Sequence, residues 1–222
     1  MTKITRRAPA SGPGGVTSGT LEGDLTERQL ALVGLIVLEW NEIEFLIQTM
    51  TYTALNLPAQ HWISIAVSIQ HASAVELIKE SFRSLQLPEQ IADAIDTSLR
   101  ASTAVKQSRD GVTHARMVNG HLAVGGNIKR GGSSLHFQET NLSDEALTHL
   151  REHMKLVRRE LTWSINLIDM WKGISHLLHP RTGRQPLPEE IYHNSTELQE
   201  IVARLVESQA QRAISKVPEF PY

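Results

Sequence analysis

Apolar residues recur at steps of three or four positions between residues 147 and 171, and this spacing constrains the fold more than any other feature of the chain. On an α-helix, such a spacing gathers the apolar side chains into one stripe along one face. Ser143 is well placed to cap this helix, with Asp144 and Glu145 favourable beside its N-terminal dipole. The stripe consists of Leu147, Leu150, Met154, Val157, Leu161, Ile165, Ile168 and Trp171. A helix of this kind needs other apolar faces to pack against, so the sequence predicts a helical bundle.

Two segments nearer the N-terminus show the same periodicity. Thr26 and Gln29 have the spacing of a capping box, and the helix that they open is expected to end at Pro58. A second helix is expected over about residues 60–85, because apolar positions recur there at helical spacing. These two segments supply further faces for the predicted bundle.

The remaining helices complete the expected fold. Pro88 suits the first turn of a third long helix, and Thr196 with Gln199 has a capping pattern that is expected to open a helix ending near Ile214. The sequence therefore predicts a mainly α protein. Its expected architecture is an up-and-down bundle of four long helices with an extra C-terminal helix.

Glycine and asparagine interrupt the helical pattern at about residues 117–141. Two short runs in this segment, 121–124 and 135–138, are flanked by turn-forming glycine pairs. The segment is therefore expected to be a small β-hairpin or a glycine-rich insertion. The predicted organisation is a disordered tail at 1–24, a helical bundle domain at 25–178 that contains the insertion, and a linker with the C-terminal helix at 179–222.

Composition excludes several classes of site. The chain has 222 residues, 41% of them hydrophobic, no cysteine and a formal net charge of −2. The absence of cysteine excludes disulfides, thiolate chemistry and Cys-ligated zinc. No glycine-rich phosphate loop is present, and we expect neither a cofactor nor a metal site. No secretory signal and no run of about 20 apolar residues is visible, so we expect a cytoplasmic protein without membrane contact.

One hexapeptide, Arg109-Asp110-Gly111-Val112-Thr113-His114, supplies a plausible set of chemical groups. Asp110 and His114 are one helical turn apart, so the carboxylate is expected to orient the imidazole. Arg109 and His114 lie about 140° apart on an ideal helix. Gly111 favours a bend or a helix end, which would let both converge on one phosphate.

The acid after the arginine makes this motif selective. An Arg and a His separated by four to six positions also occur at Arg116/His121 and Arg130/His136, as expected by chance in a chain with ten histidines. Requiring Asn, Asp or His directly after the Arg lowers the chance expectation to roughly 0.07 matches. Arg109 alone passes this filter.

The hexapeptide and the helical bundle over roughly residues 25–175 resemble the HEPN superfamily (higher eukaryotes and prokaryotes nucleotide-binding). Its signature is Arg, a polar residue, three variable positions and His, which Arg109, Asp110 and His114 fill. The resemblance implies a metal-independent endoribonuclease in which two motifs meet across a homodimer. It implies that His114 is the general acid or base, that Arg109 binds the phosphate and that Asp110 holds the geometry. A toxin or defence role, with a protein partner such as an antitoxin, is implied by the resemblance alone.

Positive charge is concentrated around the motif. Between Arg100 and Leu135 there are six basic residues and one acid, a local charge of +5 in a chain of net charge −2. Such a field suits a phosphate backbone. The basic residues expected to bind RNA beside the catalytic group are Lys106, Arg116, Lys129 and Arg130.

Non-catalytic interpretations of these residues are also compatible with the sequence. Arg109 and Asp110 are also compatible with ordinary surface charges, and His114 with a cation at the end of a helix. In that case the chain is a non-catalytic module that dimerises, binds a partner or binds a nucleotide. His149 and His153 have zinc-ligand spacing, but they favour a solvated helix face. Glu39 and Glu44 are interpreted as ordinary charged residues of a helix. The alternative hypothesis is that one of them forms a buried ion pair with the Arg109 motif. The four tryptophans are expected in the core or at an interface.

Overall fold

The computed structural model describes residues 25–58, 68–118, 121–125, 137–139, 142–177 and 187–215. Helices dominate these residues, so the predicted mainly α class is confirmed. The expected tail at 1–24 and most of the expected linker, 179–186, lie outside the described residues and stay predictions. No helix in the described part of the chain is long and apolar enough to cross a membrane.

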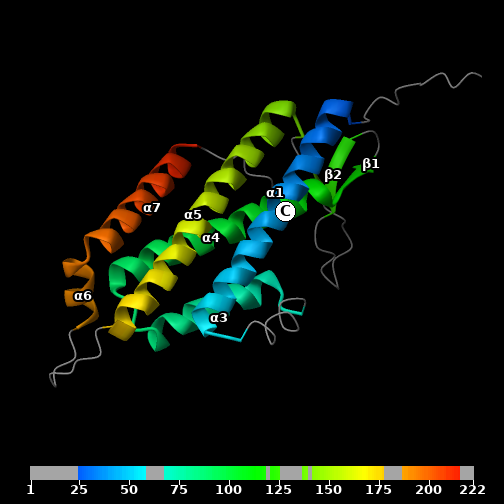
Figure 1. Cartoon of the computed structure of the whole chain (residues 1–222). Helices are drawn as coiled ribbons and strands as arrows, with labels where there is room; N and C mark the ends of the chain where they lie inside the picture. The colour runs from blue at the N-terminus through cyan, green and yellow to red at the C-terminus, as the bar shows by residue number, and fades with distance from the viewer. Residues whose placement is uncertain are drawn as a thin grey trace, which may run out of the picture.

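The two longest helices, α1 (Glu27–Leu55) and α5 (Asp144–Leu177), lie side by side and run in the same direction (Figure 1). Their first turns are joined by an ion pair of 2.9 Å between Arg28 Nε and Asp144 Oδ2. Near their last turns, Lys172 Nζ donates a hydrogen bond of 2.9 Å to the Thr53 carbonyl. These contacts at both ends fix the register of the pair. The parallel direction differs from the predicted up-and-down order, in which the first and fourth long helices run antiparallel.

The predicted capping residues do cap these helices. Thr26 Oγ1 accepts a hydrogen bond of 3.1 Å from the Gln29 N–H, and Gln29 Oε1 accepts one of 2.9 Å from the Thr26 N–H. Ser143 Oγ accepts a hydrogen bond of 3.2 Å from the Ala146 N–H at the start of α5. At its other end α1 stops at Asn56, whose φ of 51° lies in the left-handed region that asparagine tolerates. Both capping predictions are confirmed.

The next two helices are α3 (His71–Ser84) and α4 (Glu89–Thr113), and α4 crosses behind α5 and α1 (Figure 1). The helix expected over residues 60–85 was predicted too long, because residues 68–70 are not helical; residues 59–67 lie outside the described residues. At the end of α3, Trp171 Nε1 of α5 donates a hydrogen bond of 2.8 Å to the Leu85 carbonyl.

Helix α5 lies at the centre of the bundle and contacts α1, α4 and α7. The apolar stripe predicted on it is buried throughout: Ile165 is 9% exposed and the other seven side chains are at most 1% exposed. A large apolar side chain that becomes fully buried contributes about 1.5–3 kcal/mol. The periodicity of this segment therefore identifies the core correctly.

The C-terminal region contains α6 (Pro188–Asn194) and α7 (Thr196–Ile214). The sequence predicted the second of these helices and missed the first, although Pro188 stands at a favourable first-turn position. The cap of α7 is one residue earlier than predicted, because Ser195 Oγ accepts a hydrogen bond of 3.3 Å from the Leu198 N–H. Gln199 instead donates to the Tyr192 and His193 carbonyls.

A buried ion pair joins α7 to α5. Glu160 is 0% exposed, and Arg212 Nε donates to its two oxygens at 2.8 Å and 3.1 Å. Burial raises the pKa of the Glu160 carboxyl, and the hydrogen bond from Arg212 opposes this rise. A buried charge is tolerated when it is paired and hydrogen-bonded, so the Arg212 contact is part of what holds α7 on the bundle.

Three short strands connect α4 to α5: β1 (Ala115–Val118), β2 (His121–Gly125) and β3 (Phe137–Glu139). They form an antiparallel sheet in the order β1-β2-β3, with Arg116 opposite Ala123 and Val124 opposite Gln138. Strand β1 begins directly after the Arg109 motif, two residues before the insertion that the sequence predicted. The sheet therefore follows the candidate site without a spacer.

Candidate functional site

The Arg109 motif lies in the last turns of α4. The helix continues through Gly111, which is buried, and ends at Thr113. The expectation that Gly111 bends or ends the helix is therefore wrong. His114 is the C-cap residue, its side chain is exposed, and its backbone N–H donates a hydrogen bond of 2.9 Å to the Asp110 carbonyl. The helix is unbroken to Thr113, and on an ideal helix Arg109 and the position of His114 lie about 140° apart.

Asp110 does not orient His114 as predicted; its carboxylate binds two cations of α4 instead. Lys106 Nζ lies 2.5 Å from Asp110 Oδ2, and Arg109 Nη1 lies 2.8 Å from Asp110 Oδ1. Burial alone would raise the pKa of Asp110, but the hydrogen bonds from Lys106 and Arg109 outweigh it and hold the pKa below its ordinary value of 3.8. Lys106 and Arg109 thus donate together to one anionic group. A phosphate oxygen would need two converging donors of the same kind.

Trp40 of α1 positions the guanidinium of Arg109. The guanidinium carbon lies 5.9 Å from the centre of the Trp40 ring, within the range of a cation–π contact. Trp40 itself is 2% exposed, so the ring is a rigid support. Arg109 Nε is buried and has no hydrogen-bond partner. The buried Nε is out of reach of a ligand, but the side chain as a whole is 23% exposed, so part of this fixed guanidinium is open to an anion.

His71, the first residue of α3, lies on the same tryptophan. The centres of its ring and the Trp40 ring are 5.2 Å apart, and its Nε2 is 3.4 Å from Ser102 Oγ. His71 is 6% exposed and its Nδ1 has no partner. Burial and, to a lesser extent, the charge of Lys106 lower the pKa of His71 to about 4, although Asp110 opposes them. The side chain is therefore neutral at pH 7.

These contacts define the Arg109 cluster, which consists of Trp40, His71, Ser102, Lys106, Arg109 and Asp110. The sequence analysis did not predict that His71 and Ser102 belong to it. No spacing along the chain connects them with Arg109, because they meet only when α3 packs beside α4 and α1. The four residues predicted to bind RNA are only partly placed by the structure. Lys106 belongs to the cluster; the Arg116 side chain, in β1, and Lys129 and Arg130 lie outside what the structure describes.

Two other predicted groupings are corrected. Glu39 pairs with α5 rather than with the Arg109 motif, through Arg158 Nη1 at 3.0 Å and Arg151 Nε at 4.0 Å. His153 is 7% exposed, so it does not share a solvated face with His149. Burial and the nearby Arg212 lower the pKa of His153 to about 4. Among the residues that the structure describes, no three histidine or acidic side chains gather into a metal-binding group.

Comparisons with known proteins assign no relatives. No family model matches the chain, and neither a curated protein nor a solved structure is significantly similar to it. The residues of this chain are therefore the basis for a proposed function.

Proposed function

We propose that the protein is a metal-independent endoribonuclease of the HEPN type, with Arg109 and His114 as its catalytic residues. The observation that carries the proposal is the geometry of Arg109, whose guanidinium is supported by Trp40 and held by Asp110. His114, at the end of the same helix, is exposed to solvent. Arginine that is fixed in advance stabilises the charge of a phosphoryl transition state.

The chemistry is an internal transfer within RNA. The 2′-hydroxyl oxygen attacks the adjacent phosphorus, and its proton passes to a base. The bond from phosphorus to the 5′-oxygen breaks, and an acid gives that oxygen a proton. The products are a 2′,3′-cyclic phosphate and a 5′-hydroxyl end. An imidazole suits either proton transfer, because histidine ordinarily titrates near neutral pH.

Two copies of the chain are part of this proposal. Within one copy, Arg109 and the position of His114 lie about 140° apart on an ideal helix. A second copy brings its own His114 to the Arg109 of the first, as the resemblance to the HEPN superfamily implies. The four-helix arrangement of that superfamily, a toxin or defence role and a protein partner such as an antitoxin enter the proposal only through the same resemblance.

Cleavage of RNA in the presence of a chelator tests the proposal. Purified protein with EDTA is expected to cut single-stranded RNA and to leave 2′,3′-cyclic phosphate and 5′-hydroxyl ends, detected by end-specific labelling. A parallel preparation with both Arg109 and His114 replaced by alanine identifies cleavage by a contaminating nuclease. Cleavage that starts only after a divalent metal is added, or that leaves 3′-hydroxyl ends, contradicts the proposal.

Asp110 is a positioning residue in this proposal, and its replacement should change binding and turnover in opposite directions. In Asp110→Asn the competing carboxylate charge is removed from Lys106 and Arg109, so KM for RNA is expected to fall. Because the guanidinium is held less firmly, kcat is expected to fall about tenfold, within the range for a misplaced catalytic group. Steady-state cleavage kinetics separate the two constants, and Asp96→Asn on the same helix is the control. If kcat and KM both stay at their wild-type values, Asp110 has no positioning role.

The alternative is a non-catalytic module that binds a partner or a nucleotide. It is favoured by the ion pairs of Asp110, which already satisfy Lys106 and one end of Arg109. In that case Asp110→Asn strengthens binding of an anionic ligand while no RNA is cleaved by any variant. The same two assays therefore distinguish the alternatives.

A further inference from the structure

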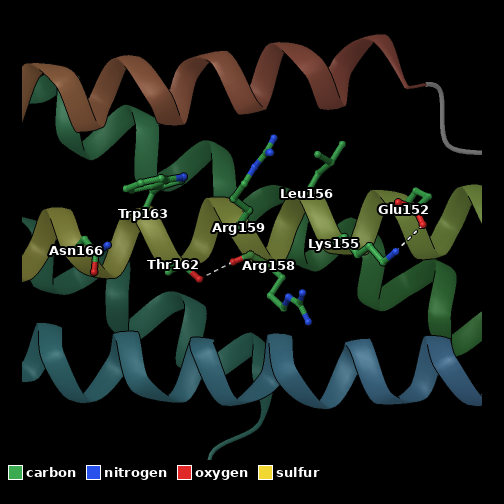
Figure 2. A pocket seen from close by; sticks show the side chains of 8 residues that line it. All are labelled: Glu152, Lys155, Leu156, Arg158, Arg159, Thr162, Trp163 and Asn166. Carbon is green, nitrogen blue, oxygen red and sulfur yellow. Dashed lines mark hydrogen bonds and ion pairs between the residues drawn. The ribbon is translucent and has the colours of Figure 1, made fainter.

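A groove on the outer face of α5, away from Arg109, has the chemistry of a second binding site. It has a volume of about 610 Å³ and is lined by α5 between Glu152 and Asn166. Figure 2 shows α1 along one side of it and α7 along the other. With a rise of about 1.5 Å per residue, the lined face is about 21 Å long.

Three cations line the groove against one acid. Arg158 points toward α1 and Arg159 toward α7, while Lys155 lies along the floor and pairs with Glu152 at 2.7 Å (Figure 2). Arg159 donates its hydrogen bonds to neutral groups, Ser208 Oγ at 3.1 Å and Gln211 Oε1 at 2.8 Å. Arg158 is paired with Glu39 of α1 at 3.0 Å. With Lys155 paired to Glu152, Arg159 is the lining cation whose hydrogen bonds do not cancel its charge.

An aromatic ring lies at the same groove. Trp163 is partly exposed, unlike the buried Trp40 and Trp171. The guanidinium carbon of Arg204, on α7, lies 5.6 Å from the centre of its ring. Cations along a groove with an aromatic ring among them are the combination that holds single-stranded nucleic acid, by phosphate contacts and base stacking.

We propose that the α5 groove is an accessory binding site for single-stranded RNA, in which Lys155 and Arg159 contact phosphates and Trp163 contacts a base. The choice of RNA rests on the proposed function. Three of the eight lining residues are cationic, and this charge complements a phosphate backbone. The length suits roughly four nucleotides, at the lower end of single-strand sites.

Fluorescence anisotropy with a labelled oligouridylate of about 12 nucleotides tests this site. All proteins carry His114→Ala, so that cleavage does not alter the probe. Lys155→Glu and Arg159→Glu are each expected to weaken binding about tenfold, and each lost cation to reduce the slope of log affinity against log salt by about 0.7. Arg83→Glu, a charge reversal at an exposed position near the end of α3, is the matched control and should change affinity less than twofold.

A gain of affinity separates this inference from a folding defect. Glu152→Gln frees Lys155 from its ion pair and is expected to strengthen binding about threefold, an effect that damage to the fold does not produce. Unchanged affinity in Lys155→Glu, Arg159→Glu and Glu152→Gln overturns the accessory site. If these variants change the binding of poly-L-glutamate and leave RNA binding unchanged, the accessory RNA site is also overturned. The groove is then assigned to acidic peptides. Wild-type cleavage with cyclic phosphate ends leaves the proposed function standing in either case.

Discussion

Replacing His114 by alanine is expected to lower the rate of RNA cleavage by a factor of about 10² to 10⁴, the contribution of a general acid or base. The side chain is exposed and caps the end of α4 only through its backbone N–H, which alanine retains. The variant should therefore fold with the stability of the wild type. Single-turnover cleavage of RNA measures the rate, and thermal unfolding checks the fold.

The control for this variant is His149→Ala, since His149 is an exposed histidine on α5. It should cleave RNA at the wild-type rate. A loss of less than tenfold in His114→Ala, or an equal loss in His149→Ala, would remove His114 from the catalytic machinery. Arg109→Lys adds an independent variant: lysine keeps the charge but not the planar fork, and removing one transition-state donor costs about 10² to 10³ in rate.

Mixing two inactive variants shows where the two groups come from. If Arg109 of one copy works with His114 of a second copy, a mixture of Arg109→Ala and His114→Ala protein restores activity, because some mixed dimers contain one intact pair. With random exchange of subunits, about a quarter of the wild-type sites are intact. No restoration after proven exchange would place both groups within one copy and contradict the geometry argued from the end of α4.

The helices could be predicted from the sequence where periodicity and capping agree. The stripe from Leu147 to Trp171 is buried, and the caps at Thr26 and Ser143 form the predicted hydrogen bonds. Both signals are local, since a cap and a stripe depend on residues within a few turns. Helix α6 was missed because its seven residues are too few for a periodic pattern to stand out beside the neighbouring proline and glycine.

The composition of the Arg109 cluster could be predicted only in part. Spacing on α4 placed Lys106, Arg109 and Asp110 near one another, but it assigned Asp110 to His114. Lys106 and Arg109 lie within reach of this carboxylate and donate charged hydrogen bonds, which are the stronger kind. Trp40 and His71 join the cluster through packing of α1 and α3 against α4. No pattern along the chain reports such a tertiary contact.

Acidification from pH 7 to pH 5 is expected to lower the free energy of unfolding by about 2 kcal/mol for each of two buried histidines. Burial lowers the pKa of His71 and of His153 from 6.5 to about 4. Between these values the unfolded chain binds a proton that the folded protein does not. Stability is therefore highest above pH 6.5, falls as the pH drops toward 4, and loses nothing more from this source below that. Urea unfolding at a series of pH values measures the loss.

Glutamine variants assign this loss to the two histidines. His71→Gln and His153→Gln each remove one titrating group, so each should lose about half as much stability as the wild type over the same range, and the double variant very little. The pKa of Glu160, which burial raises, acts in the opposite sense in every variant, so comparisons between variants cancel it. His114→Ala should keep the full wild-type dependence. If the double variant loses as much stability as the wild type, the burial of these imidazoles is not what makes the fold sensitive to acid.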